Sequence, residues 1–215
     1  MLRRTFLMSL APYLLLQEKP EQVVPPPSYR IVDLGVVGRR GTPDLLALWR
    51  QRQKARASAL ERLNKPARRI SIDPDAPAPI AKDWPISLVD INDSGVAVGS
   101  VLYAVGGNDI EVQDPVLWKD GKPILLEGLG GRDEAAYSIN NRGQIVGSAG
   151  GRGSASGSRP CLWLDQKPYD LNLLIPSRSG WKLKDTMVLI DDRGQILVQG
   201  QFKGKEHVAR LIPGA

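Results

Sequence analysis

The chain has 215 residues, of which 42% are hydrophobic, and this is enough to build one domain with a real core. Its single cysteine, Cys161, excludes an intramolecular disulfide, and its single histidine, His207, excludes a site made of several histidines. The formal net charge of +6 is unevenly placed, because residues 39–69 contain ten basic and two acidic residues whereas the rest of the chain carries −2.

The amino terminus has the form of an export signal. Two arginines precede an apolar run over residues 6–16, which is too short to cross a bilayer as a helix. Arg3-Arg4-Thr5-Phe6-Leu7-Met8 also resembles the twin-arginine signal. We therefore expect a signal peptide over residues 1–17, a proline-rich linker over residues 18–28, and a periplasmic or extracellular protein that is not a multi-span membrane protein. Whether and where the signal is cleaved stays open.

Residues 39–69 form a basic insertion that is predicted to be helical. Thr42-Pro43-Asp44 is typical of a helix start, and no glycine or proline interrupts the stretch from Leu45 to Asn64. One interpretation is a basic helix that binds an anionic cell-envelope surface, either lipid or polymer, through Arg50, Arg52, Lys54, Arg56 and Arg62. The other is a helix that packs on the β-strands through its apolar residues and leaves its arginines in solvent. No sequence-specific binding of nucleic acid is expected.

The remainder of the chain contains a repeat of about fifty residues. Its signature is Ile-Asx-Asx-x-Gly, which begins at Ile91, Ile139 and Ile190. Asx side chains cap turns and glycine supplies a positive φ, so the signature predicts a hairpin between two strands. The structural turn residues are Asn92, Gly95, Asn140, Gly143, Asp191 and Gly194.

A second hairpin follows in the first two units. Trp118 and Trp163 occupy equivalent places in it and are expected to anchor the core. The third unit has only three predicted strands and ends at residues 207–213. We expect residues 29–34 to supply its fourth strand by pairing with residues 208–212, and so to close the array.

Several of these motifs together resemble the bacterial extracellular HAF repeats, named for a His-Ala-Phe tripeptide. The resemblance rests on the segments 139–147, 170–176 and 179–181, and on Leu129-Gly-Gly131. It covers residues 86–215 and 29–38, although the naming tripeptide itself is poorly kept. It implies an exported repeat protein with propeller-like blades and no established activity.

The predicted fold is therefore all-β, with a β-repeat domain over residues 29–215. It comprises three four-stranded antiparallel repeats in a propeller-like arrangement, closed by the N-terminal strand and interrupted by one helix. A β-trefoil and a half-ring completed by dimerisation remain as alternatives.

Catalytic and metal-binding chemistry is not expected. Asp90 opens a stretch with the oxygen spacing of a calcium loop, but Val101 stands where such a loop needs glutamate. Cys161 occupies a predicted strand position, which is typical of a buried thiol. His207 stands where the resembling repeats carry their histidine, and it is expected to pack or to form a hydrogen bond and not to act as a base. We expect no catalytic residue, metal or cofactor, and predict a non-catalytic binding or structural module of unknown ligand. An envelope-associated protein that docks through its basic helix is the alternative.

Overall fold

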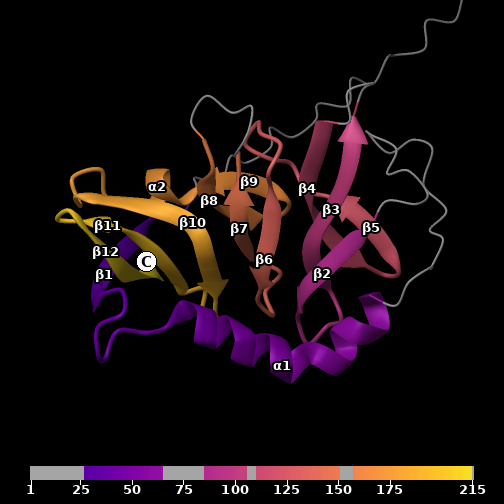
Figure 1. Ribbon diagram of the computed structural model, residues 1–215, viewed down its shortest axis with the longest axis horizontal. Helices are drawn as coiled ribbons and strands as arrows, with labels where there is room; N and C mark the ends of the chain where they lie inside the picture. Colours follow the sequence, from indigo (N-terminus) through magenta and orange to yellow (C-terminus); the bar gives the residue numbers. More distant parts are fainter. Residues whose placement is uncertain (1–26, 65–84, 106–109, 151–156, 215) are drawn as a thin grey trace, which may run out of the picture.

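The computed structural model describes residues 27–64, 85–105, 110–150 and 157–214, and most of them lie in three four-stranded antiparallel sheets (Figure 1). The first sheet has the order β2 (Ile86–Ile91), β3 (Ala97–Val105), β4 (Ile110–Lys119) and β5 (Lys122–Leu125). The second has the order β6 (Ala135–Ile139), β7 (Ile145–Ala149), β8 (Arg159–Leu164) and β9 (Lys167–Asp170). The third has the order β1 (Tyr29–Val36), β12 (Lys205–Pro213), β11 (Ile196–Phe202) and β10 (Trp181–Ile190).

Each sheet corresponds to one predicted repeat, which we call units one, two and three. The prediction of three four-stranded antiparallel repeats with an inserted helix is confirmed. The sheets do not close into a barrel. The β-trefoil alternative is therefore wrong, because a trefoil joins strands of all three units in one barrel.

The N-terminal strand completes the third sheet, as predicted. β1 pairs antiparallel with β12, in a register that matches Tyr29 with Pro213 and Asp33 with Ala209. Tyr29 is 3% exposed and lies in the same core as β10 and β11. Unit three supplies only three strands from its own sequence, so the segment that precedes the helix fills its open edge.

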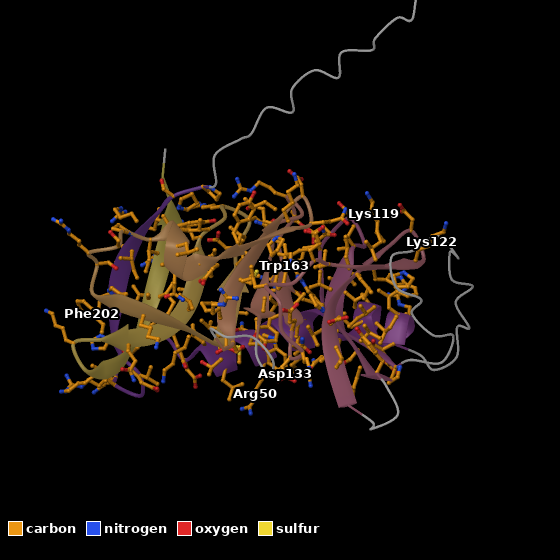
Figure 2. All side chains as sticks on the ribbon, turned by 90° about the horizontal axis from the view of Figure 1, so that it is seen from above. Arg50, Lys119, Lys122, Asp133, Trp163 and Phe202 are labelled. Carbon is orange, nitrogen blue, oxygen red and sulfur yellow. The ribbon has the colours of Figure 1, made fainter. Side chains whose placement is uncertain are left out.

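The sheets pack on one another through buried faces. One apolar cluster joins the first and second sheets, and another joins the second and third. Trp163 is fully buried and donates from its indole N–H to the Glu127 carbonyl at 2.7 Å, and Figure 2 shows it in the interior. Trp118 is 7% exposed and lies in a third cluster with Leu60 of the helix. Both tryptophans are core anchors, as predicted.

All three units share an irregularity between their first two strands. The register shifts after Leu88, Ala136 and Leu183, each of which pairs with a glycine: Gly99, Gly147 or Gly200. A Cβ on Gly147 would lie 2.0 Å from the Ala135 carbonyl oxygen, against 2.9 Å between a Cβ on Gly200 and the Lys182 carbonyl oxygen. Glycine is thus required by the close approach of two backbones at this bulge.

We predict that Gly147→Ala lowers the free energy of unfolding by about 3 kcal/mol, because the backbone of β6 must move to admit the methyl group. Gly200→Ala should cost about 1 kcal/mol, since its site is less crowded. Urea unfolding of both variants measures the difference, and equal losses would contradict the crowding argument.

Helix α1 spans Leu45–Asn64, as predicted, and runs beneath all three sheets (Figure 1). Asp44 begins it, since its Oδ1 accepts a hydrogen bond from the Ala47 N–H at 3.1 Å. Within the described ranges, no helix combines the length and apolar character needed to cross a membrane.

In the second hairpin of unit two, the sequence pattern predicts a last strand over residues 168–173, which is too long. β9 ends at Asp170, and Leu171–Leu174 form a single helical turn, α2. The Asp170 carboxylate caps this turn by accepting from the Asn172 N–H at 2.9 Å. Leu171 and Leu174 are buried whereas Leu173 is 80% exposed, which follows the spacing of a helical turn.

Candidate functional site

The three Asx turns have the geometry that their sequence predicts. In unit two, Asn140 Oδ1 accepts from the N–H groups of Arg142 and Gln144, both at 3.0 Å. Asn92 and Asp191 accept equivalent bonds in units one and three. The glycines that follow have φ values of +79°, +75° and +77° at Gly95, Gly143 and Gly194.

These turns also bond to one another, which the turn motif alone does not predict. Asn92 Nδ2 donates to the Asn140 carbonyl at 3.2 Å, and Asn140 Nδ2 donates to the Asp191 carbonyl at 2.9 Å. The second Asx position forms a parallel row, because Asn141 Nδ2 donates to carboxylate oxygens of Asp93 at 2.6 Å and Asp192 at 3.2 Å. The turn residues therefore form a ladder that runs from unit one to unit three.

The ladder has a direction, because the side-chain amide at the first Asx position of one unit donates a hydrogen bond to the next unit. The last unit differs from the first two at the residues that make these bonds. Asn92 and Asn140 each need an amide N–H for the next unit, whereas Asp191 has no described unit beyond it and lacks that donor. Two residues before the turn, Asp90 Oδ2 accepts from the Ile139 N–H at 2.9 Å and Ser138 Oγ from the Ile190 N–H at 3.5 Å. The equivalent residue of unit three is the apolar Leu189.

Arg52 of α1 joins all three units at this ladder. Its Nε lies 2.8 Å from Asp90 Oδ2 in unit one, and its Nη1 donates to the Ile190 carbonyl of unit three at 2.9 Å. Its Nη2 donates to the Ile139 carbonyl of unit two. Arg56 forms a second ion pair with Asp90, which is only 2% exposed. Asp90, the candidate opening ligand of a calcium loop, is thus held by two arginines.

Two of the five predicted anion-binding residues therefore face inward. Arg52 and Arg56 are engaged by Asp90 and by backbone carbonyls, so they form part of the contact between helix and sheets. Arg50, Lys54 and Arg62 are exposed along α1, and Figure 2 shows Arg50 at the edge of the molecule. The helix is docked on the sheets, but the expectation that a docked helix leaves its arginines in solvent is wrong for Arg52 and Arg56, because polar contacts hold its centre.

The ends of α1 dock differently. Leu60, near its carboxyl end, packs on the outer face of the first sheet with Leu88 and Trp118. Its final residue, Asn64, donates to the Leu88 carbonyl at 2.8 Å and accepts from the Leu88 N–H at 2.9 Å. The helix thereby covers the face of unit one that has no neighbouring sheet.

The corresponding face of unit three is only partly covered, and a groove of about 430 Å³ remains there. Strand alternation places Leu189, Leu197 and Arg210 on this face, opposite the core residues Val188, Val198 and Leu211. The start of α1 and the end of β1 form the other wall. The residues that line the groove include Leu48, Arg52, Leu189, Asp191, Leu197 and Arg210.

The reactive side chains outside this groove have structural partners. Cys161 is fully buried, and burial raises the pKa of its thiol well above the ordinary range. Glu134, 3% exposed, accepts from the N–H groups of Leu129, Gly131 and Gly150 at 3.1, 3.2 and 2.7 Å. In the described part of the chain, no three His, Cys, Asp or Glu side chains are placed to hold a metal ion.

His207 links the two ends of the described chain. Its Nδ1 lies 2.9 Å from Asp33 Oδ1 on β1, and its ring packs edge-on against Trp181 and Phe202, which stack on each other at 4.7 Å. The packing role predicted for His207 is in agreement with these contacts. The residue also pairs β12 with β1 through its side chain.

We predict that Asp33→Asn destabilises the protein at neutral pH but not in acid. Burial raises the pKa of Asp33, but hydrogen bonds from His207 and the Gly35 N–H outweigh it and lower the pKa below its ordinary value. A carboxyl whose folded pKa is lowered stabilises the fold above its unfolded pKa and loses that contribution as the pH falls through the folded pKa. The loss at pH 7 should stay below about 1 kcal/mol because the pair is partly exposed. Thermal unfolding of both proteins between about pH 7 and about pH 2 tests this, and a pH-independent difference would contradict it.

Comparisons of the chain with protein families, with curated proteins and with solved structures gave no match.

Proposed function

We propose that the chain is an exported, non-catalytic β-repeat module that binds a ligand in the groove between α1 and the third sheet. The observation that carries this proposal is the incomplete cover of the third sheet. Both faces of the second sheet and the outer face of the first are packed, whereas Leu48 and Leu197 leave apolar surface accessible in the groove. Concave, mainly apolar sites with a few polar groups are typical of small-molecule binding.

The non-catalytic part of the proposal is supported by the roles of the reactive groups. The single histidine and single cysteine, and the buried carboxylates of Asp90 and Glu134, all have structural partners. A general base or nucleophile would instead need access to a substrate.

The resemblance to HAF repeats and the propeller-like relation of the three sheets belong to the same proposal. Four-stranded antiparallel sheets that neighbour one another through their first strands, as β2, β6 and β10 do, support it. The export signal lies outside the described residues, as do residues 18–26 of the linker and residues 65–69 of the insertion. A reporter fused after residue 28 should be exported, and changing both Arg3 and Arg4 to lysine should block this if the route is the twin-arginine one.

Binding in the groove is tested by a nuclear magnetic resonance screen of small amphiphilic and aromatic molecules against the full chain. Molecules that bind should shift the resonances of Leu48, Leu189 and Leu197. The Leu48→Ser substitution should weaken their binding. Leu46→Ser is the matched control, since Leu46 is equally exposed on α1 but does not line the groove. Shifts confined to other surfaces would contradict the proposal.

Envelope association is a second candidate, favoured by the outer face of α1. Arg50, Lys54 and Arg62 are exposed along the helix, and the exposed Leu46 and Leu48 lie near its start. Basic and apolar groups together bind anionic bilayers. Co-sedimentation with phosphatidylglycerol vesicles at low and high salt should show binding that salt weakens and that the triple glutamine variant of the three basic residues loses. Failure of the wild type to bind at low salt would exclude this candidate.

A further inference from the structure

We propose that the groove binds a single-chain amphiphilic carboxylate, a fatty-acid-like anion with its chain on the leucines and its carboxylate on Arg210. The proposal names the ligand class of the site described above, and it rests on that site being a binding groove. Three properties of the groove carry it: its apolar floor, the excess of positive charge at its walls, and its size.

The floor of the groove is apolar at the repeat position that is polar in units one and two. Leu189 occupies the position at which Asp90 and Ser138 accept a hydrogen bond from the following unit. Leu189 and Leu197 are partners across β10 and β11, and Leu48 reaches the groove from α1 with 39% of its surface exposed. A hydrocarbon chain can pack on such an apolar row, whereas a polar turn would find no hydrogen-bond acceptor there.

Positive charge lies beside this row. Arg210 of β12 pairs with Leu197 of β11 on one side and with Val32 of β1 on the other. Its side chain is exposed and has no ion pair with a described residue. Its neighbours in the sheet are therefore apolar, and its guanidinium is available to a ligand. An arginine binds a carboxylate through two parallel hydrogen bonds, which a neutral head group cannot match.

The opposite wall adds to this preference. Arg52 and Arg56 share one carboxylate, that of Asp90, so this cluster carries one net positive charge. The groove contains one acidic lining residue, Asp191, and its Oδ1 already accepts from the N–H groups of Arg193 and Gln195. The groove therefore favours an anion over a cation.

The size of the groove indicates a free single-chain ligand. About 430 Å³ lies at the lower end of the range for small-molecule pockets, about 300–1,000 Å³. One alkyl chain with a head group fits this volume, whereas a folded partner needs a far larger surface, on the order of 800 Å² on each side.

The test is isothermal titration calorimetry of the full chain with octanoate and octylammonium, each below its micelle concentration, and with 1-octanol below its solubility limit. Octanoate should bind at one site, 1-octanol about fivefold more weakly, and octylammonium more weakly still. Arg210→Gln should weaken octanoate about fivefold and leave 1-octanol unchanged, while Leu48→Ser should weaken both. Lys205→Gln on the same strand and Leu46→Ser on the same helix are the matched controls and should change neither.

The outcomes separate this proposal from the one it rests on. Equal binding of octanoate and 1-octanol, with no effect of Arg210→Gln, would overturn the ligand class and leave the groove as a binding site. No binding of any of the three by folded wild type, checked by circular dichroism, would overturn both. Octanoate binding that Leu48→Ser and Leu46→Ser weaken equally would place the ligand elsewhere and overturn the groove assignment. Binding to anionic vesicles alone would favour envelope association instead.

Discussion

Replacing Arg52 by glutamine is expected to lower the free energy of unfolding by about 3 kcal/mol. The guanidinium pairs with Asp90 and donates to the carbonyls of Ile139 and Ile190, so a single side chain ties α1 to all three units. Glutamine can donate to one of these carbonyls, but it leaves the other without that donor and leaves Asp90, which is 2% exposed, paired with Arg56 alone of the two arginines. A hydrogen bond from a charged group contributes about 1.5–3 kcal/mol, and a buried carbonyl that loses its donor adds a cost of about 1–3 kcal/mol.

The matched control is Arg50→Gln, two residues earlier on the same helix. Arg50 is exposed, so its loss should change the stability by no more than about 0.5 kcal/mol. Urea unfolding followed by circular dichroism measures both variants, and native-state hydrogen exchange should show α1 opening first in Arg52→Gln. Equal stability of the two variants would show that the helix is not held through Arg52.

Asn140→Asp is expected to be equally damaging, by about 3 kcal/mol, although it changes a single atom. The Asn140 side chain is fully buried, and its Nδ2 donates to the Asp191 carbonyl and to Gln144 Oε1. A carboxylate would place an acceptor against the Asp191 carbonyl. Gln144 can turn its amide to donate, but a backbone carbonyl cannot.

The chain contains its own control for this change, because Asp191 occupies the equivalent turn of unit three. Asp191→Asn should be neutral within about 0.5 kcal/mol, since this exposed side chain keeps the oxygen that accepts from Arg193 and Gln195. In Asn140→Asp, the new carboxyl should have a raised pKa, so acid should partly restore stability by converting it to a donor. Similar effects of the two substitutions would mean that the ladder between turns contributes little.

The parts of the fold that sequence predicts are those with local signals. The Asx and glycine pattern identifies each hairpin, and Thr42-Pro43-Asp44 marks the start of α1. The pairing of β1 with β12 is predictable because unit three lacks a strand and residues 29–34 have the matching pattern. The error at α2 arises because one capping aspartate, Asp170, changes a strand end into a helical turn.

The parts that sequence does not predict depend on contacts between distant residues. Charge alone places all five basic residues of α1 together, whereas Asp90, 38 residues after Arg52, decides which of them turn inward. The sequence contained a signal for the inward arginines. The repeat places Asp90, Ser138 and Leu189 in equivalent positions, and of these only Asp90 is charged. The groove has no sequence signal of its own, because it forms where α1 and the third sheet fail to meet fully.

The length of α1 has a consequence for the number of repeats. A helix of 20 residues is about 30 Å long, and stacked sheets lie about 10 Å apart, so α1 is as long as three sheets are thick. The helix therefore extends from the outer face of unit one to the edge of unit three. One segment that is not itself repeated thus contacts all three units, and in this chain its length matches that of the array.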